Sequence, residues 1–383
     1  MKRLLAFGTT LLVSLNVFAA WDLNDVSYLM PLPAQVGPDN LLGIEAPGRG
    51  GPLIAPKLLD AVPILSVTMT QSQINEALRV VALRIDPCFP LPTPQACQRQ
   101  LRLVWQPLEE GRRNHVQTVD AALHSFYVLT DAEFTTLLQD IATWKAKYGV
   151  STAGLPLQVH PAWSAEGDKS PALVDFNAII RKYAGAQNLS RVTAMALRGA
   201  GDMWVFQGFA VNNGSLSLLK IPRTDRAAQG FVNQAVPADH FERGMIAPAP
   251  KGDDTVNKLI VNSANLQEGN EEAIRKDVRG AYRIENPKNY SPETMDCASC
   301  HAAQPAREWA QRKRSDIFTG DLWQSFAYQN SRYNLTNTTQ ILGNTQNLRA
   351  FGYFIDDVAI SQRVINESAE VADAINQYLL LGK

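Results

Sequence analysis

The chain contains 383 residues, of which 45% are hydrophobic and 19% are charged, and its formal net charge is −1. This composition describes an ordinary globular protein that is soluble in water. The small net charge gives no electrostatic reason to expect nucleic acid or an anionic membrane as a partner. Beyond the N-terminal segment, no apolar run approaches the roughly 20 residues needed to cross a bilayer, so no transmembrane segment is expected after processing.

The N-terminal segment has the pattern of a bacterial export signal. Lys2 and Arg3 precede an apolar run that ends at Val17, and small residues follow it. A positively charged start, an apolar stretch and a small-residue processing site are the three parts of a secretory signal. We therefore expect residues 1–19 to be removed and the mature protein to be periplasmic or secreted. About 360 residues then remain. A chain of this length is longer than a single hydrophobic core usually stabilises, so we expect two domains.

The first part of the mature chain, residues 20–62, is rich in Pro and Gly and has no sustained periodicity. It predicts an extended arm that lies over the following domain. Residues 63–244 alternate irregularly between strand-like and helix-like patterns. They predict an α+β domain with antiparallel strands, whose role the sequence does not indicate.

Two cysteines lie in this predicted α+β domain. Cys88 and Cys97 are separated by only eight residues, three of which are prolines. In an oxidising compartment, this pair favours a disulfide that closes the loop, and two inert buried thiols are the alternative. Residues 78–85 and 100–106 on either side are predicted strands, so the bridge would staple a β-hairpin.

Further along the same domain, the spacing of apolar residues predicts helices at 131–148 and 171–183. Three short strands are predicted after them, at 191–198, 203–211 and 215–221. Their connectors, Gly199-Ala200-Gly201-Asp202 and Asn212-Asn213-Gly214, have the chemistry of hairpin turns, which indicates an antiparallel meander. The Gly-rich connector lacks the strand-turn-helix context of a phosphate-binding loop.

A domain boundary is predicted where the composition changes to that of an exposed connector, at 245–254. We therefore expect a linker at 245–264 and a second domain at 265–383. Within this second domain, helical spacing appears at 271–283 and 362–381.

The most informative feature of the second predicted domain is the pentapeptide Cys297-Ala298-Ser299-Cys300-His301. A C-x-x-C-H motif in an exported protein is typical of haem c attachment. Two thiols three positions apart can add to the two vinyl groups on one porphyrin edge, and the imidazole of the next residue then lies beneath the iron. The motif predicts one covalent haem c, with thioether bonds to Cys297 and Cys300 and with His301 as the proximal iron ligand.

A thioredoxin-like dithiol and a zinc half-site are alternative uses of such a cysteine pair. A thioredoxin motif starts a helix after a strand of a βαβ unit, whereas residues 286–296 are loop-like. A zinc site needs a second pair of ligands with short spacing, and Cys88 and Cys97 lie about two hundred positions upstream. The export signal therefore favours haem attachment.

Residues 265–383 resemble a monohaem c-type cytochrome domain of class I. The resemblance rests on the motif and on the order of a helix before it, a short helix at 307–313 after it and a long helix at the C-terminus. It implies a mainly α-helical domain whose first and last helices cross near the haem edge. The class II pattern is a four-helix bundle with the haem motif close to the C-terminus. It fits this sequence badly, because 82 residues follow His301. The upstream two thirds of the chain resemble no family.

The sixth iron ligand is not defined by this resemblance. Class I domains supply a downstream methionine, whereas no Met or His follows His301 here. The position can be vacant, filled by an unusual downstream donor, or completed from upstream. His240 and Met245 adjoin the predicted linker and are the preferred candidates, whereas His124 on an apparent strand is expected to be a hydrogen-bonded core histidine. The other candidates are Tyr333, Asn347 and Tyr353 downstream, and His115, His160, Met203 and Met295 upstream.

Other residues near the motif can surround a porphyrin. The basic run Arg312-Lys313-Arg314 can pair with haem propionates, although a solvated helix face is the preferred interpretation. Candidate apolar walls are Trp309, Trp323 and Phe351, residue types that also fill cores everywhere.

Three functions are compatible with one attached haem. Single-electron transfer to a redox partner protein is preferred, because a protein can tune the iron through ligation, burial and hydrogen bonding. Haem-based catalysis, or binding of peroxide, nitric oxide or carbon monoxide, requires an open distal position. A partner-binding envelope protein with an attached haem is the third alternative. Upstream motifs for catalysis are not evident, so an electron carrier is preferred to an enzyme.

Overall fold

The computed structural model describes residues 20–35, 37–89, 97–198, 203–233, 244–260, 271–318, 321–339, 348 and 350–380. The predicted export signal at 1–19 lies outside these described residues, as do His240 and Asn347. Within the described ranges, no helix has both the length and the apolar character that crossing a bilayer requires.

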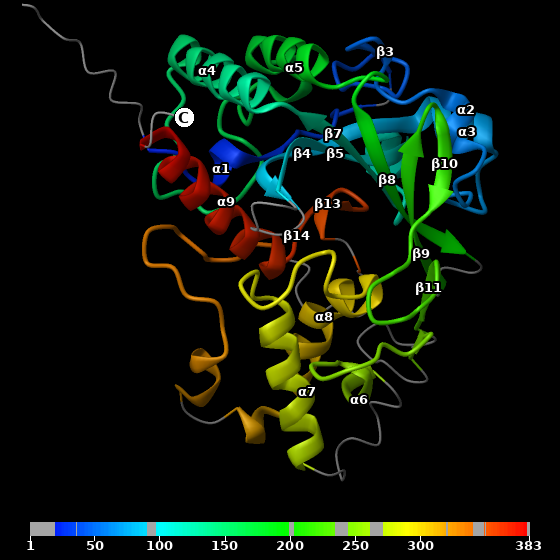
Figure 1. Ribbon diagram of the computed structural model, residues 1–383, viewed down its shortest axis with the longest axis vertical. Coiled ribbons are helices and arrows are strands. Elements are labelled where there is room, and N and C mark those ends of the chain that lie inside the picture. The colour runs from blue at the N-terminus through cyan, green and yellow to red at the C-terminus, as the bar shows by residue number, and fades with distance from the viewer. Residues whose placement is uncertain are drawn as a thin grey trace, which may run out of the picture.

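One antiparallel sheet forms the centre of the molecule, and ten of the described strands belong to it (Figure 1). The main path runs β1-β4-β5-β7-β8-β9-β11-β12, while β6 pairs with β5 and β10 pairs with β9. These strands are β1 (Ser27–Leu29), β4 (Leu78–Phe89), β5 (Gln98–Glu110), β6 (Val116–Thr118), β7 (Ala122–Leu129), β8 (Leu189–Arg198), β9 (Met203–Asn212), β10 (Ser215–Leu218), β11 (Ala228–Val232) and β12 (Met245–Ala247).

Hairpins build this sheet where the sequence predicts them. Strands β4 and β5 pair from Leu78 opposite Pro107 to Phe89 opposite Gln98, and a disulfide joins Cys88 to Cys97, the predicted pairing. The β9–β10 turn places Asn213 at φ 49° and Gly214 at φ 73°. Two successive positive φ angles at an Asn-Gly pair are the geometry of a tight hairpin turn.

One face of the sheet is covered by α4 (Asp131–Tyr148) and α5 (Pro171–Tyr183), both at the predicted positions (Figure 1). Leu103 and Trp105 of β5 are buried on this face together with Phe134 of α4 and Phe176 of α5. The segment at 20–62 adds further buried side chains to the same core. It contains α1 (Leu23–Val26), β1, the short strands β2 (Pro47–Gly48) and β3 (Gly51–Pro52), and α2 (Pro56–Leu59), and α3 (Gln71–Ala77) follows it.

The other face of the sheet meets the C-terminal elements. Val104 of β5 packs in a core with Phe351 and with Ile365, which come from β13 and α9. Further along the sheet, Phe206 and Phe231 share a second core with the helices around the C-x-x-C-H motif. The elements are α6 (Asn257–Ile260), α7 (Glu271–Ile284), α8 (Cys297–Lys313), the hairpin β13 (Phe351–Phe354) and β14 (Asp357–Ile360), and α9 (Gln362–Leu380).

The expected fold class, an α+β domain followed by a mainly α-helical cytochrome c-like domain, is wrong. The large antiparallel sheet dominates the molecule, and the β13–β14 hairpin lies between α8 and α9 in the chain. Ala372 and Ile375 of α9 are fully buried in the core of the sheet. Helical spacing correctly located α7 and α9, but an amphipathic pattern shows only that a helix has an apolar face, not which element covers it.

Two other predicted segments have structure of their own. The short helix expected at 307–313 is the C-terminal part of α8, which begins at Cys297. Within the predicted linker at 245–264, residues 245–247 form β12 and residues 257–260 form α6. The division of the chain into two domains at this linker stays a prediction.

Candidate functional site

The C-x-x-C-H motif forms the beginning of helix α8. Asp296 is the N-cap residue, and its carboxylate accepts a hydrogen bond of 3.0 Å from the amide of Ser299. Residues at positions i, i+3 and i+4 lie on one face of a helix. The helix start therefore places Cys297, Cys300 and His301 on a common face.

Two buried polar contacts hold α8 in place. Gln229 of β11 donates a hydrogen bond of 2.8 Å to the Asp296 carboxylate and accepts one of 2.9 Å from the Ala298 amide. Further along α8, the Arg307 guanidinium donates to both carboxylate oxygens of Glu285 at distances of 3.0 to 3.1 Å. The helix that carries the motif is thus tied both to the sheet and to the end of α7.

The two motif cysteines are thiols that stay protonated at neutral pH. They form no disulfide, and burial raises the pKa of Cys297 to about 12 and that of Cys300 to about 11. A thiol that exchanges disulfides has a lowered pKa instead. Turns rather than a strand precede the motif. The raised thiol pKa values and the turns in place of a preceding strand both differ from what a thioredoxin-like dithiol requires.

A zinc half-site was the second alternative for these cysteines. Over the described part of the chain, no group of three or more His, Cys, Asp or Glu side chains is arranged to hold a metal ion.

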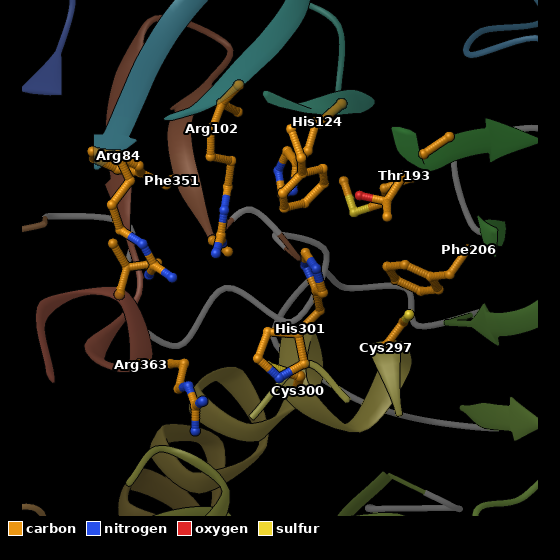
Figure 2. Close-up of a pocket in the computed structure, with 18 of the residues that line it drawn as sticks. Arg84, Arg102, His124, Thr193, Phe206, Cys297, Cys300, His301, Phe351 and Arg363 are labelled. Atoms are coloured by element: carbon orange, nitrogen blue, oxygen red, sulfur yellow. The ribbon is translucent and has the colours of Figure 1, made fainter. Parts of the chain in front are cut away.

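The motif face of α8 borders a pocket between this helix and the sheet (Figure 2). Strands β4, β5, β7, β8 and β9 provide one wall, and α8, α9 and β13 provide the other. Cys297, Cys300 and His301 all line this pocket. Figure 2 shows the His124 side chain entering it from the sheet and the His301 side chain entering it from α8.

Strand register explains which side chains form the sheet wall. His124 of β7 lies directly between Val104 of β5 and Thr193 of β8. Alternate residues of a strand share one face, so the next row on this face lies two positions along each strand. That row consists of Arg84, Arg102, Phe126 and Arg191.

Three guanidinium groups share two carboxylates at one side of the pocket. Asp86 accepts hydrogen bonds from Arg84 at 2.8 Å and from Arg102 at 3.0 Å. Glu367 of α9 accepts one from Arg363 at 2.7 Å and also pairs with Arg84. These five residues, called here the arginine cluster, link the sheet to α9.

The two carboxylates of the arginine cluster stay ionised at neutral pH. Burial opposes ionisation of Glu367, but Arg84, Arg363 and Arg102 outweigh it and hold the pKa of this carboxyl well below its usual range. The Asp86 pKa is lowered for the same reason, by Arg102 and Arg84 against burial. A buried cluster with three cations and two anions favours a further anionic group beside it.

His301 is oriented by the backbone. Its Nδ1 lies 2.6 Å from the carbonyl oxygen of Leu348. Because a carbonyl oxygen only accepts hydrogen bonds, Nδ1 carries the proton and Nε2 is the nitrogen suited to ligate a metal. Metal-binding histidines use the other ring nitrogen in this way, which fixes the ring orientation. The Phe206 ring lies beside the imidazole, with 5.0 Å between the ring centroids.

The predicted candidates for a sixth iron ligand are spread over the molecule. Met245, one of the two preferred candidates, is 49% exposed on β12 and does not line the pocket, and His240 lies outside the described residues. Met295 does line the pocket, and its sulfur accepts a hydrogen bond of 2.9 Å from Arg223. His124, expected to be a core histidine, is only half-buried and lines the pocket.

The remaining candidates have other surroundings. His160 is fully buried, and its ring lies 4.9 Å from that of Tyr28 and 4.6 Å from that of Trp163. His115 and Met203 are exposed, the Tyr333 hydroxyl donates to Asp373, and the Tyr353 hydroxyl donates to the Met30 carbonyl.

The residues predicted to surround a porphyrin are only partly at the pocket. Phe351 lines it, whereas Trp309 and Trp323 are buried in the core of α7 and α8. The basic run 312–314 lies at the opposite end of α8 from the motif, where Arg314 pairs with Asp316 at 2.8 Å.

Sequence reasoning missed the arginine cluster. Arg84 and Arg102 occupy the polar positions of alternating strands, a pattern that ordinarily indicates a solvent-exposed face. No local sequence pattern indicates that a sheet is covered on both faces. The one available clue was that the two arginines lie in adjacent predicted strands of one hairpin, which places them close together.

The donor set of this pocket fits a haem c, because two thiols and an oriented imidazole share one helix face. The cavity volume of about 180 Å³ lies below the roughly 300 Å³ at which small-molecule pockets begin, so a porphyrin requires some lining side chains to move outward. Comparison of the chain with protein-family models, with curated proteins and with solved structures finds no match. Any functional assignment therefore depends on the motif and on the geometry of the pocket.

Proposed function

We propose that this protein is an exported electron carrier with one covalent haem c. The observation that carries the proposal is that Cys297, Cys300 and His301 line one pocket from a single helix face. In this proposal the two cysteines hold the porphyrin through thioether bonds, and His301 binds the iron through Nε2. A bound haem c supplies reversible one-electron exchange.

The other pocket residues have supporting roles in this proposal. The arginine cluster offers guanidinium groups to the two propionates, since guanidinium and carboxylate form strong charge-assisted hydrogen bonds. Phe206 and Phe351 provide apolar walls that limit the access of water. Exclusion of water and fixed charges beside the cofactor are the means by which a protein adjusts a haem potential.

Export is supported by the N-terminal signal pattern and by the disulfide between Cys88 and Cys97. Disulfides persist mainly in oxidising compartments such as the periplasm. An electron carrier there exchanges electrons with a redox partner protein, which completes the proposal.

The test is to express the full chain with its signal in a bacterium that has a haem c maturation system. The periplasmic product should retain haem on a denaturing gel, and its visible spectrum should change reversibly on reduction and reoxidation. A Cys88→Ser/Cys97→Ser variant is the matched control, because it removes two thiols outside the motif and should keep the haem. A colourless product from the unaltered chain would refute the proposal.

Binding or conversion of a small ligand at the iron is the second candidate function. It is favoured by the sequence after His301, which contains neither Met nor His to close the sixth position. Carbon monoxide added to the reduced protein separates the two functions. Rapid formation of a carbonyl spectrum supports ligand chemistry, and an unchanged spectrum supports electron transfer.

A further inference from the structure

We infer that His124 is the second axial ligand of the haem iron, opposite His301. This inference depends on the proposed function, because it assigns a role toward the same cofactor. It also separates the two candidate functions, since an iron with two imidazole ligands has no open position for an added ligand.

The inference starts from the placement of the two histidines. His301 enters the pocket from α8, and His124 enters the same pocket from β7 on the opposite wall (Figure 2). A haem iron accepts its two axial ligands from opposite sides of the porphyrin plane. Among the described histidines, His124 and His301 are the two that line this pocket.

The strand that carries His124 holds it firmly. Strand β7 lies between β5 and β8, and its alternate residues Leu123, Ser125 and Tyr127 are buried on the α4 side. This alternation directs His124 to the pocket side, where its neighbours in adjacent strands are Val104 and Thr193. A side chain on a central strand is already held in position, so little conformational freedom is lost when it binds a metal ion.

Met295 is the other described candidate that lines the pocket, and its surroundings suit it less. It lies two positions before Cys297 and therefore on the same wall as the motif. Its sulfur accepts a hydrogen bond of 2.9 Å from the Arg223 guanidinium, and its side chain is packed in the core of α7 and α8. A methionine held there lies on the His301 side rather than opposite to it.

A ligand from β7 also accounts for the absence of a downstream ligand in the sequence. In class I domains the chain after the motif supplies the sixth ligand, but here the sheet covers the side of the pocket that faces α8. The upstream sheet can then supply a histidine without help from the C-terminal segment. Two imidazoles give a lower reduction potential than the His/Met pair of class I domains.

The experiment uses the haem-loaded full chain and its His124→Gly variant. The unaltered protein should give low-spin spectra in both oxidation states and should not bind carbon monoxide rapidly. The His124→Gly protein should become high-spin and bind carbon monoxide, and added imidazole should restore the low-spin spectrum. His115→Gly is the matched control, because His115 is exposed and should leave all spectra unchanged.

A second variant covers the case in which His124→Gly does not fold. His124→Met keeps a potential ligand of similar size and should raise the reduction potential, as a His/Met pair does. Low-spin spectra and a potential that are unchanged in both variants would overturn the inference, as would a high-spin spectrum in the unaltered protein. A chain that carries no haem at all would instead refute the proposed function.

Discussion

Gln229 of β11 donates a hydrogen bond of 2.8 Å to the carboxylate of Asp296, the N-cap of the helix that carries the C-x-x-C-H motif. Both residues are buried. The start of α8 is thus fixed to the sheet that forms the opposite wall of the pocket. Positions of the motif side chains relative to the sheet therefore depend on this contact.

Replacing Asp296 by Ala should lower the free energy of unfolding by about 2 kcal/mol. The change removes the cap of α8 and leaves the Gln229 amide buried without its carboxylate partner. Asn also caps helices well, so Asp296→Asn should cost clearly less. Urea unfolding of the haem-loaded proteins measures the difference, and equal losses for Ala and Asn would contradict this account of the contact.

Glu367→Gln should destabilise the protein by about 3–5 kcal/mol, because it removes the charged partner of the buried Arg363 and one of the two carboxylates that pair with Arg84. Glu271→Gln is the control, since Glu271 forms an exposed pair with Arg275 and should cost no more than about 0.5 kcal/mol. Urea unfolding at pH 7 measures the free energy of unfolding of both variants and of the unaltered protein.

The Glu367 effect should also depend on pH in a definite direction. Its pKa is lowered in the folded state, so the stabilisation is fully present above the unfolded pKa of about 4.3 and is lost as the pH falls toward the folded value. The gap between the unaltered protein and Glu367→Gln should therefore narrow when unfolding is repeated near pH 3. A gap that widens with acid would show that Glu367 is not ionised in the cluster.

His160 should make the protein sensitive to acid. Burial and the nearby Lys145 lower the pKa of His160 to about 3. Between its unfolded pKa of about 6.5 and that value, the unfolded chain binds one more proton, so stability falls as the pH falls. Within this pH range, the free energy of unfolding decreases by up to about 1.4 kcal/mol for each pH unit. A His160→Gln variant should show a flatter stability profile from pH 6.5 to pH 4, and an unchanged slope would refute the assignment.

Removal of the disulfide should weaken the sheet without affecting the pocket. A Cys88→Ser/Cys97→Ser variant loses a bridge that closes a short loop, which is worth about 2–3 kcal/mol. Differential scanning calorimetry should show a lower melting temperature, while the visible spectrum of the haem stays the same. A changed spectrum would mean that the bridge itself is needed to hold the β4 and β5 residues of the pocket wall in place.

Local elements could be predicted well from this sequence. Helices α4, α5, α7 and α9 occur at the predicted positions, and the Cys88–Cys97 pair forms as predicted. Each depends on information within a few turns or one hairpin, such as the capping pair Thr130 and Glu133 at the start of α4. Propensity and periodicity act at that range.

The arrangement of these elements could not be predicted in the same way. Ile375 of α9 packs in the core of the sheet, and nothing in its helical spacing indicates that partner. The sheet wall of the pocket combines residues from five strands, so the placement of His124 and His301 in one pocket follows only once the register of these strands is known. The motif residues themselves were evident because their chemistry depends on spacing within five positions.

The most direct test of the account is the intact mass of the exported protein, compared with that of its Cys297→Ser/Cys300→Ser variant. The unaltered chain should be heavier than its processed polypeptide by one haem, and the variant should have the polypeptide mass alone. A mass equal to the processed polypeptide alone for each protein, or a haem retained covalently by the variant, would contradict attachment at these two cysteines.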